Sequence, residues 1–60
     1  MDRFDELGNG SAFRIASDPS GEVYEKGVFP GTPQKDFNSR SLWTGKIWNC
    51  FLATKVVFVP

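Results

Sequence analysis

The chain has 60 residues with seven basic and seven acidic side chains, no histidine and one cysteine. One cysteine excludes an internal disulfide, and a structural zinc ion needs about four nitrogen or thiolate ligands. Histidine, the commonest acid-base group at neutral pH, is absent, and no glycine-rich phosphate loop occurs. The composition therefore predicts a protein that is not an enzyme and has no catalytic residue, cofactor or metal.

The charges are unevenly divided along the chain. Residues 1–30 carry six acidic and three basic side chains, whereas residues 31–60 carry one acidic and four basic ones. Opposite charges on the two halves favour their attraction within one small fold, and they also suit a self-complementary contact between copies. We expect a single domain over residues 1–60.

The first ten residues predict a short helical turn or a frayed end. Apolar residues at positions 1, 4 and 7 suit one helical turn, and Gly8-Asn9-Gly10 would end it. The acidic start has no apolar stretch, so we expect no export signal and a cytoplasmic protein. The chain also has no clean apolar run of about 20 residues, so we expect no membrane span.

A β-hairpin is the clearest local prediction, with strands over residues 12–17 and 22–26. Asp18, Pro19 and Gly21 occupy the positions that each residue favours in a type I turn, and Gly21 would be the left-handed residue of a three-residue loop. This register places Ile15 opposite Glu25. A register shifted by one would place Ile15 opposite Tyr24 and has better cross-strand pairs. We favour the first, because proline fixes its own φ.

Residues 27–33 predict an irregular connection, because Pro30 and Pro33 cannot donate in a central strand. Val28 and Phe29 would enter the core. Thr32 as N-cap and Pro33 at the first helical position predict a short helix over residues 33–37.

Residues 42–59 hold half of the apolar side chains of the chain, and their pattern is ambiguous. Trp43, Ile47, Trp48 and Phe51 have helical spacing, but the glycine, threonine and β-branched residues favour strands. We predict strands near 41–44, 47–52 and 55–59, with a tight turn over residues 44–46. Cys50 is expected to be a buried free thiol.

The predicted fold class is mainly β: a small barrel-like or curled antiparallel sheet, of the size of SH3-like and OB-like domains, with one or two short helical turns. The nine aromatic residues exceed what so small a core can hold. We therefore expect a non-catalytic protein-binding module that acts through an aromatic surface patch or through an unpaired C-terminal edge strand. Its partner would be another protein or a second copy of the chain, in a homo-oligomer. Core packing is the competing interpretation of each tryptophan. The candidate partner-binding residues are Trp43, Trp48, Arg40, Lys46, Tyr24 and Phe29.

Two other functions fit the residues less well. Basic side chains alternate with aromatic ones over residues 35–55, as in small barrels that bind single-stranded nucleic acid, but the neutral total charge argues against this alternative. The third interpretation is a structural subunit of a larger assembly. The size of the chain also suits the small accessory or inhibitor proteins of viruses and phages.

Overall fold

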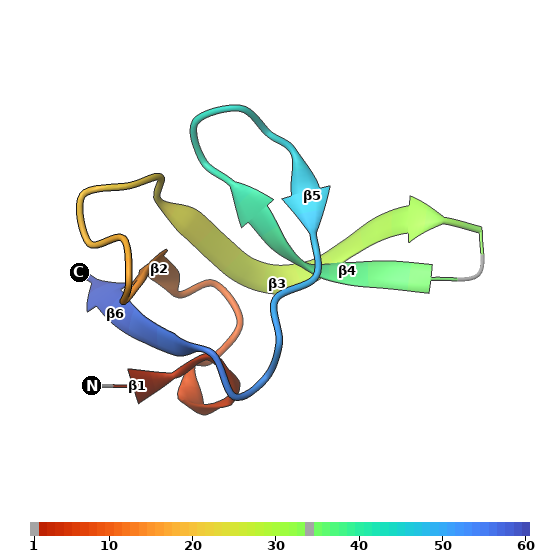
Figure 1. The fold of residues 1–60 in the computed structure, drawn as a ribbon. Coiled ribbons are helices and arrows are strands. Elements are labelled where there is room, and N and C mark those ends of the chain that lie inside the picture. The colour runs from red at the N-terminus through yellow and green to blue at the C-terminus, as the bar shows by residue number, and fades with distance from the viewer. Residues whose placement is uncertain (1, 34) are drawn as a thin grey trace.

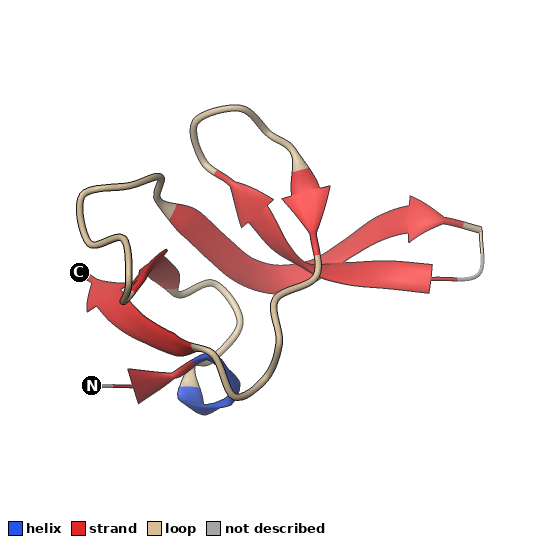
Figure 2. Ribbon diagram, in the orientation of Figure 1, coloured by secondary structure: helices blue, strands red, loops and turns tan. Residues whose placement is uncertain are grey.

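The computed structural model describes residues 2–33 and 35–60, and its main feature is one antiparallel sheet (Figures 1 and 2). A single turn of 3-10 helix, η1, follows the first strand. The elements are β1 (Asp2–Arg3), η1 (Phe4–Glu6), β2 (Ala12–Ile15), β3 (Tyr24–Thr32), β4 (Lys35–Ser41), β5 (Ile47–Trp48) and β6 (Lys55–Val59).

The strand order in the sheet is β1-β6-β2-β3-β4-β5. Strands β2 to β5 are paired in chain order, and the chain then returns so that β6 pairs with β2. The sheet curls but does not close, because β1 and β5 remain its two edges (Figure 1). The predicted fold class, a curled antiparallel sheet with a short helical turn, is confirmed.

The core lies inside the curl and is small. Its fully buried apolar side chains are Phe4, Phe13, Cys50 and Val56, and the Phe4 and Phe13 rings meet edge to face at 5.3 Å. Partly buried side chains extend this cluster on its open side: Leu7, Ile15, Tyr24 and Trp48. Because Phe4 comes from η1, the N-terminal turn is part of the core.

The predicted helical turn near the N-terminus is confirmed at Phe4–Glu6, whereas Met1 lies outside the described residues. Backbone hydrogen bonds join the turn to the start of β6: Phe4 N–H donates to the Thr54 carbonyl at 2.8 Å, and Asp5 N–H to the Leu52 carbonyl at 3.0 Å. These bonds explain why the segment is ordered instead of frayed.

The predicted β2–β3 hairpin exists, but both of its predicted registers are wrong. The turn over Asp18–Gly21 is present, with Gly21 N–H donating to the Asp18 carbonyl at 3.0 Å. The strands pair as Ala12 with Glu25 and Phe13 with Tyr24. The connection is longer than a tight hairpin loop because the end of β2 turns away to pair with β6. Gly21 does not have the predicted positive φ.

Strands β3 and β4 form a long hairpin, not the predicted irregular connection and short helix, of which residue 34 lies outside the described residues. Its outer part projects as a two-stranded arm beyond the rest of the sheet (Figure 2). Pro30 is tolerated because strand β3 has β4 on one side only at this point, so no second partner requires its missing N–H. Val28 is 64% exposed, so its predicted place in the core is wrong. Phe29 is half-buried on the arm, opposite Phe37.

The C-terminal third contains strands, as predicted, but two of them have other bounds. The predicted strand at 41–44 is wrong beyond Ser41, since residues 42–46 form the β4–β5 turn, in which Gly45 has a φ of +78°. The predicted strand 47–52 is limited to Ile47–Trp48. The predicted strand 55–59 is confirmed as β6. Strand β6 lies between β1 and β2, so it is not the unpaired edge strand of the prediction.

The connection from β5 to β6 is held against β4 by one asparagine. The Asn38 amide donates to the Cys50 carbonyl at 2.9 Å and accepts from Cys50 N–H at 2.8 Å. This pairing places the Cys50 thiol in the core, as predicted, and burial raises the pKa of the thiol above its usual value. None of the helices in the described part of the chain is long and apolar enough to span a membrane.

Candidate functional site

The register of the central strands divides the predicted binding residues between two faces of the sheet. Tyr24 on β3 pairs with Ser41 on β4, and Trp48 on β5 pairs with Ser39, so these four residues share the face toward the core. Arg40 comes between the two serines, and alternation along β4 puts it on the opposite face.

Small residues on β4 allow the two aromatic side chains to meet. Ser39 and Ser41 lie between Tyr24 and Trp48 on the shared face, and neither serine has a side chain large enough to separate the rings. The Tyr24 and Trp48 rings therefore contact each other edge to face, with centroids 4.9 Å apart. Such pairs contribute about 0.5–1.5 kcal/mol beyond their buried area.

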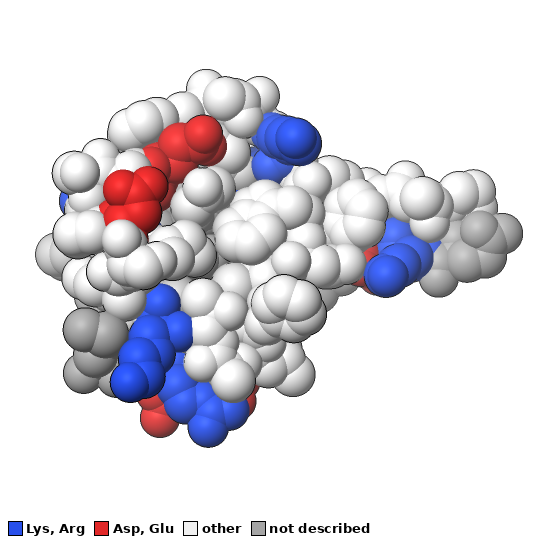
Figure 3. All heavy atoms as spheres, in the orientation of Figure 1, with Lys and Arg blue, Asp and Glu red and all other residues white. Residues whose placement is uncertain are grey.

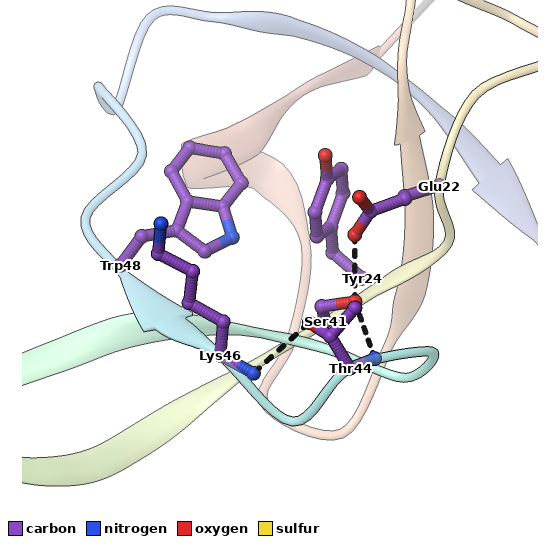
Figure 4. A pocket seen from close by; sticks show the side chains of 6 residues that line it. All are labelled: Glu22, Tyr24, Ser41, Thr44, Lys46 and Trp48. Atoms are coloured by element: carbon purple, nitrogen blue, oxygen red, sulfur yellow. Dashed lines mark hydrogen bonds between the residues drawn. The ribbon is translucent and has the colours of Figure 1, made fainter.

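A pocket of about 440 Å³ opens beside this aromatic pair (Figure 4). Its volume falls within the range of about 300–1,000 Å³ that is usual for binding pockets of small groups. The lining residues come from the start of β3, the end of β4, the β4–β5 turn and β5: Glu22, Tyr24, Ser41, Thr44, Lys46 and Trp48.

Ser41 organises the polar side of the pocket. Its hydroxyl donates to Glu22 Oε2 at 2.7 Å and accepts from the backbone N–H groups of Trp43 and Thr44, both at 3.1 Å. The serine is almost fully buried, so this network fixes both the β4–β5 turn and the Glu22 carboxylate. Glu22 Oε1 has no hydrogen-bond partner in residues 2–33 and 35–60 and remains available to a ligand.

The pocket has a negative and a positive side. Figure 4 shows the Glu22 carboxylate beside Tyr24, whereas the Lys46 side chain runs along Trp48. The described residues contain no ion pair between Glu22 and Lys46. Burial raises the pKa of the Tyr24 hydroxyl, and the nearby Glu22 and Asp18 carboxylates raise it further. The negative field of these two acids therefore reaches the aromatic pair.

The β4–β5 turn next to the pocket carries two exposed apolar residues, Leu42 and Trp43. Trp43 is 63% exposed, so core packing does not account for it, whereas Trp48 packs against the core cluster. A backbone hydrogen bond from Leu42 N–H to the Val23 carbonyl, 3.0 Å long, joins the turn to the residue after Glu22. Leu42 and Trp43 lie in the chain between Ser41 and Thr44, two residues that line the pocket, and we call the pocket lining together with this exposed turn the pocket–turn surface.

The remaining two predicted residues lie elsewhere. Arg40 donates to Glu25 Oε1 at 2.8 Å, and its guanidinium lies 5.1 Å from the centroid of the Phe29 ring. Arg40 lies on the other face of β4, and its guanidinium covers part of the Phe29 ring. The structure thus brings Tyr24, Lys46 and Trp48 together, with Trp43 alongside, and separates Arg40 and Phe29 from them.

Glu22, Ser41 and Thr44 line the pocket but were not among the residues predicted from the sequence. The sequence signal for this polar group is the pair of serines at positions 39 and 41, in a strand that lies between the strands of Tyr24 and Trp48. A polar residue repeated on an inward-facing strand position needs hydrogen-bond partners.

The described residues contain no group of three or more histidine, cysteine, aspartate or glutamate side chains that would hold a metal ion. The acid that lines the pocket, Glu22, is held by the Ser41 hydroxyl. Comparison of the chain with protein-family models, with curated proteins and with solved structures gives no match.

Proposed function

We propose that the protein is a non-catalytic binding module whose pocket–turn surface holds a linear segment of another protein. The observation that carries the proposal is the exposure of Leu42 and Trp43, 48% and 63%, in the turn between two lining residues of a pocket that has an aromatic wall. Tryptophan and other aromatic residues are enriched at the energetic centres of protein interfaces. A pocket that adjoins an exposed tryptophan offers one side-chain site and one apolar contact.

A linear segment fits this surface better than a broad, flat partner. The pocket and the turn are built from a few residues at one end of β4 and β5, and the β3–β4 arm projects away from the rest of the sheet (Figure 1). An extended peptide needs only two or three anchoring contacts, whereas a standard protein interface buries about 800 Å² on each partner.

The proposal is tested by selection from a library of random linear peptides displayed on phage. Wild-type protein should enrich peptides that Trp43→Ala no longer retains, because this substitution removes the exposed anchor without touching the core. Val28→Ala is the matched control: Val28 is equally exposed, at 64%, but lies on the β3–β4 arm. Enriched peptides that bind wild type and Trp43→Ala equally would overturn the proposal, as would the absence of any enrichment.

A second copy of the chain is the competing occupant of this surface. Sedimentation of the wild-type protein distinguishes the two, because self-association through Trp43 would increase the average mass with concentration and would be lost in Trp43→Ala. Such a result would replace the partner segment with a homo-oligomer. A monomer at all concentrations agrees with the proposal.

A further inference from the structure

The pocket combines three features that each bear on the charge of a ligand. Its wall is the Tyr24–Trp48 pair, and aromatic ring faces attract cations. Glu22 contributes a carboxylate with one oxygen free among the described residues, and Lys46 contributes the only basic group that lines the pocket. Two of the three features favour a cation and one favours an anion.

The Glu22 carboxylate is held in place by the fold, whereas the Lys46 ammonium is not. Glu22 is held by the buried Ser41 hydroxyl at 2.7 Å, which orients the carboxylate before any ligand arrives. Lys46 is exposed, and its hydrogen bonds among the described residues are made by its backbone N–H and carbonyl, not by its ammonium. A long exposed side chain of this kind can turn its ammonium into water at little cost.

The charges on the surface around the pocket are divided in the same way as those that line it. Acidic side chains gather over the β2–β3 loop, apart from the basic group at the β4–β5 turn (Figure 3). Asp18 lies in this loop and adds its field to that of Glu22 at Tyr24. The side of the pocket formed by Glu22 and Tyr24 is therefore negative.

We propose that the Tyr24–Trp48 pocket binds an arginine side chain of the partner segment, with Glu22 as the counter-charge and the aromatic pair as the stacking wall. A planar guanidinium can stack on a ring and donate to a carboxylate at the same time, whereas a lysine ammonium is a strongly hydrated point charge. Leu42 and Trp43 then contact an apolar residue next to the arginine. This inference depends on the proposed function, whose segment it describes.

The test uses three blocked pentapeptides and the intact protein. The peptides are acetyl-Gly-Leu-Arg-Leu-Gly-amide and its analogues with citrulline or glutamate in place of arginine. Citrulline has nearly the shape of arginine without its charge. The indole N–H signals of Trp48 and Trp43 in nuclear magnetic resonance spectra report on the pocket and the turn, and Trp43→Phe assigns them.

The arginine peptide should shift the Trp48 signal and bind at least about tenfold more tightly than the citrulline peptide, because it alone brings a positive charge to its hydrogen bond with the Glu22 carboxylate. The glutamate peptide should bind most weakly. Equal affinities for arginine and citrulline, tightest binding of the glutamate peptide, or no shift with any peptide would overturn the inference.

Two variants, each of which removes one charge from the pocket, should affect peptide affinity differently if the site binds a cation. Glu22→Gln keeps an oxygen acceptor for Ser41 and should weaken the arginine peptide about tenfold, whereas Lys46→Gln should leave its affinity unchanged or raise it. The reverse pattern would identify an anion site. The comparison of arginine with citrulline on wild-type protein needs no variant, so the inference stays testable even if Glu22→Gln fails to fold. Phage-selected peptides that depend on Trp43 but not on Glu22 would contradict this inference alone and leave the proposed function standing.

Discussion

The Lys26 ammonium donates a hydrogen bond to the backbone carbonyl of Phe4 at 2.9 Å and lies 4.6 Å from the centroid of the Phe4 ring. A second bond joins the same ammonium to the Leu7 carbonyl at 2.6 Å. One charged side chain from β3 thus bonds a carbonyl at each end of η1, those of Phe4 and Leu7, and holds the core residue Phe4 in place.

Lys26→Met is expected to destabilise the protein. Methionine keeps the apolar stem of the side chain but leaves the partly buried Leu7 carbonyl without its donor and the Phe4 carbonyl with the Leu7 N–H alone, which costs about 2 kcal/mol. Urea unfolding followed by tryptophan fluorescence measures the change. Lys35→Met is the control, because Lys35 is exposed and should unfold like wild type. The same midpoint for Lys26→Met and Lys35→Met would contradict the assigned role of Lys26.

The two tryptophans should differ in their contribution to stability. Trp48→Ala removes a ring that packs on Tyr24 and on the core, and it should lower the free energy of unfolding by about 3 kcal/mol. Trp43→Ala removes an exposed ring and should change it by less than about 0.5 kcal/mol. Urea unfolding of both variants, followed by circular dichroism, tests the difference. A large loss in Trp43→Ala would place this tryptophan in the core of the protein in solution.

The single tyrosine should titrate above its usual value of 10.0, because burial and then the nearby Glu22 and Asp18 raise the pKa of Tyr24. An absorbance titration measures it, and Glu22→Gln should bring it closer to 10.0. A Tyr24 pKa that is unchanged in Glu22→Gln would contradict the assigned effect of the Glu22 carboxylate on Tyr24.

The same shift predicts the direction of alkaline destabilisation. A folded-state pKa above the unfolded one means that the stabilising contribution of neutral Tyr24 is complete below pH 10 and is lost as the pH rises through the folded-state value. Cys50 acts in the same direction from its usual value of 9.0 upward. As the pH is raised above 10, Tyr24→Phe should therefore lose less stability than the wild-type protein. Thermal melting at a series of pH values measures this difference. Parallel losses would contradict the assignment to Tyr24.

The β3–β4 arm should respond to substitution without unfolding the rest. A Cβ atom on Gly31 would lie 2.7 Å from Cε2 of Phe37, so Gly31→Val should displace this ring and open the outer pairs of the hairpin. Gly8→Ala is the control, because nothing lies within 4 Å of the added Cβ atom. Amide hydrogen exchange should become faster in residues 28–37 only. Faster exchange in β2 and β6 as well would show that the arm supports the core.

The sequence predicts those parts of the fold that depend on local chemistry. The turn at Asp18–Gly21, the turn around Gly45 and the β-branched strand β6 are present. The β2–β3 register was not predictable from the turn, because pairing of the end of β2 with β6 decides it, and that contact joins residues far apart in the chain.

The β3–β4 arm was missed for a related reason. Proline and glycine at positions 30 and 31 oppose a central strand, but this part of β3 pairs on one side only, where proline is permitted. Three members of the pocket lining were predicted for their aromatic or basic character: Tyr24, Lys46 and Trp48. Glu22 was missed because its role depends on Ser41, which lies 19 residues later in the chain.

The central claim is that the surface around Trp43 binds a partner segment, and one affinity comparison tests it most directly. A phage-selected peptide is titrated into wild type, Trp43→Ala and Val28→Ala, each first shown to be folded by circular dichroism. Truncation of a central interface tryptophan should weaken binding by a factor of about 30 or more, and the control should bind like wild type. Equal affinity of all three proteins would contradict the account.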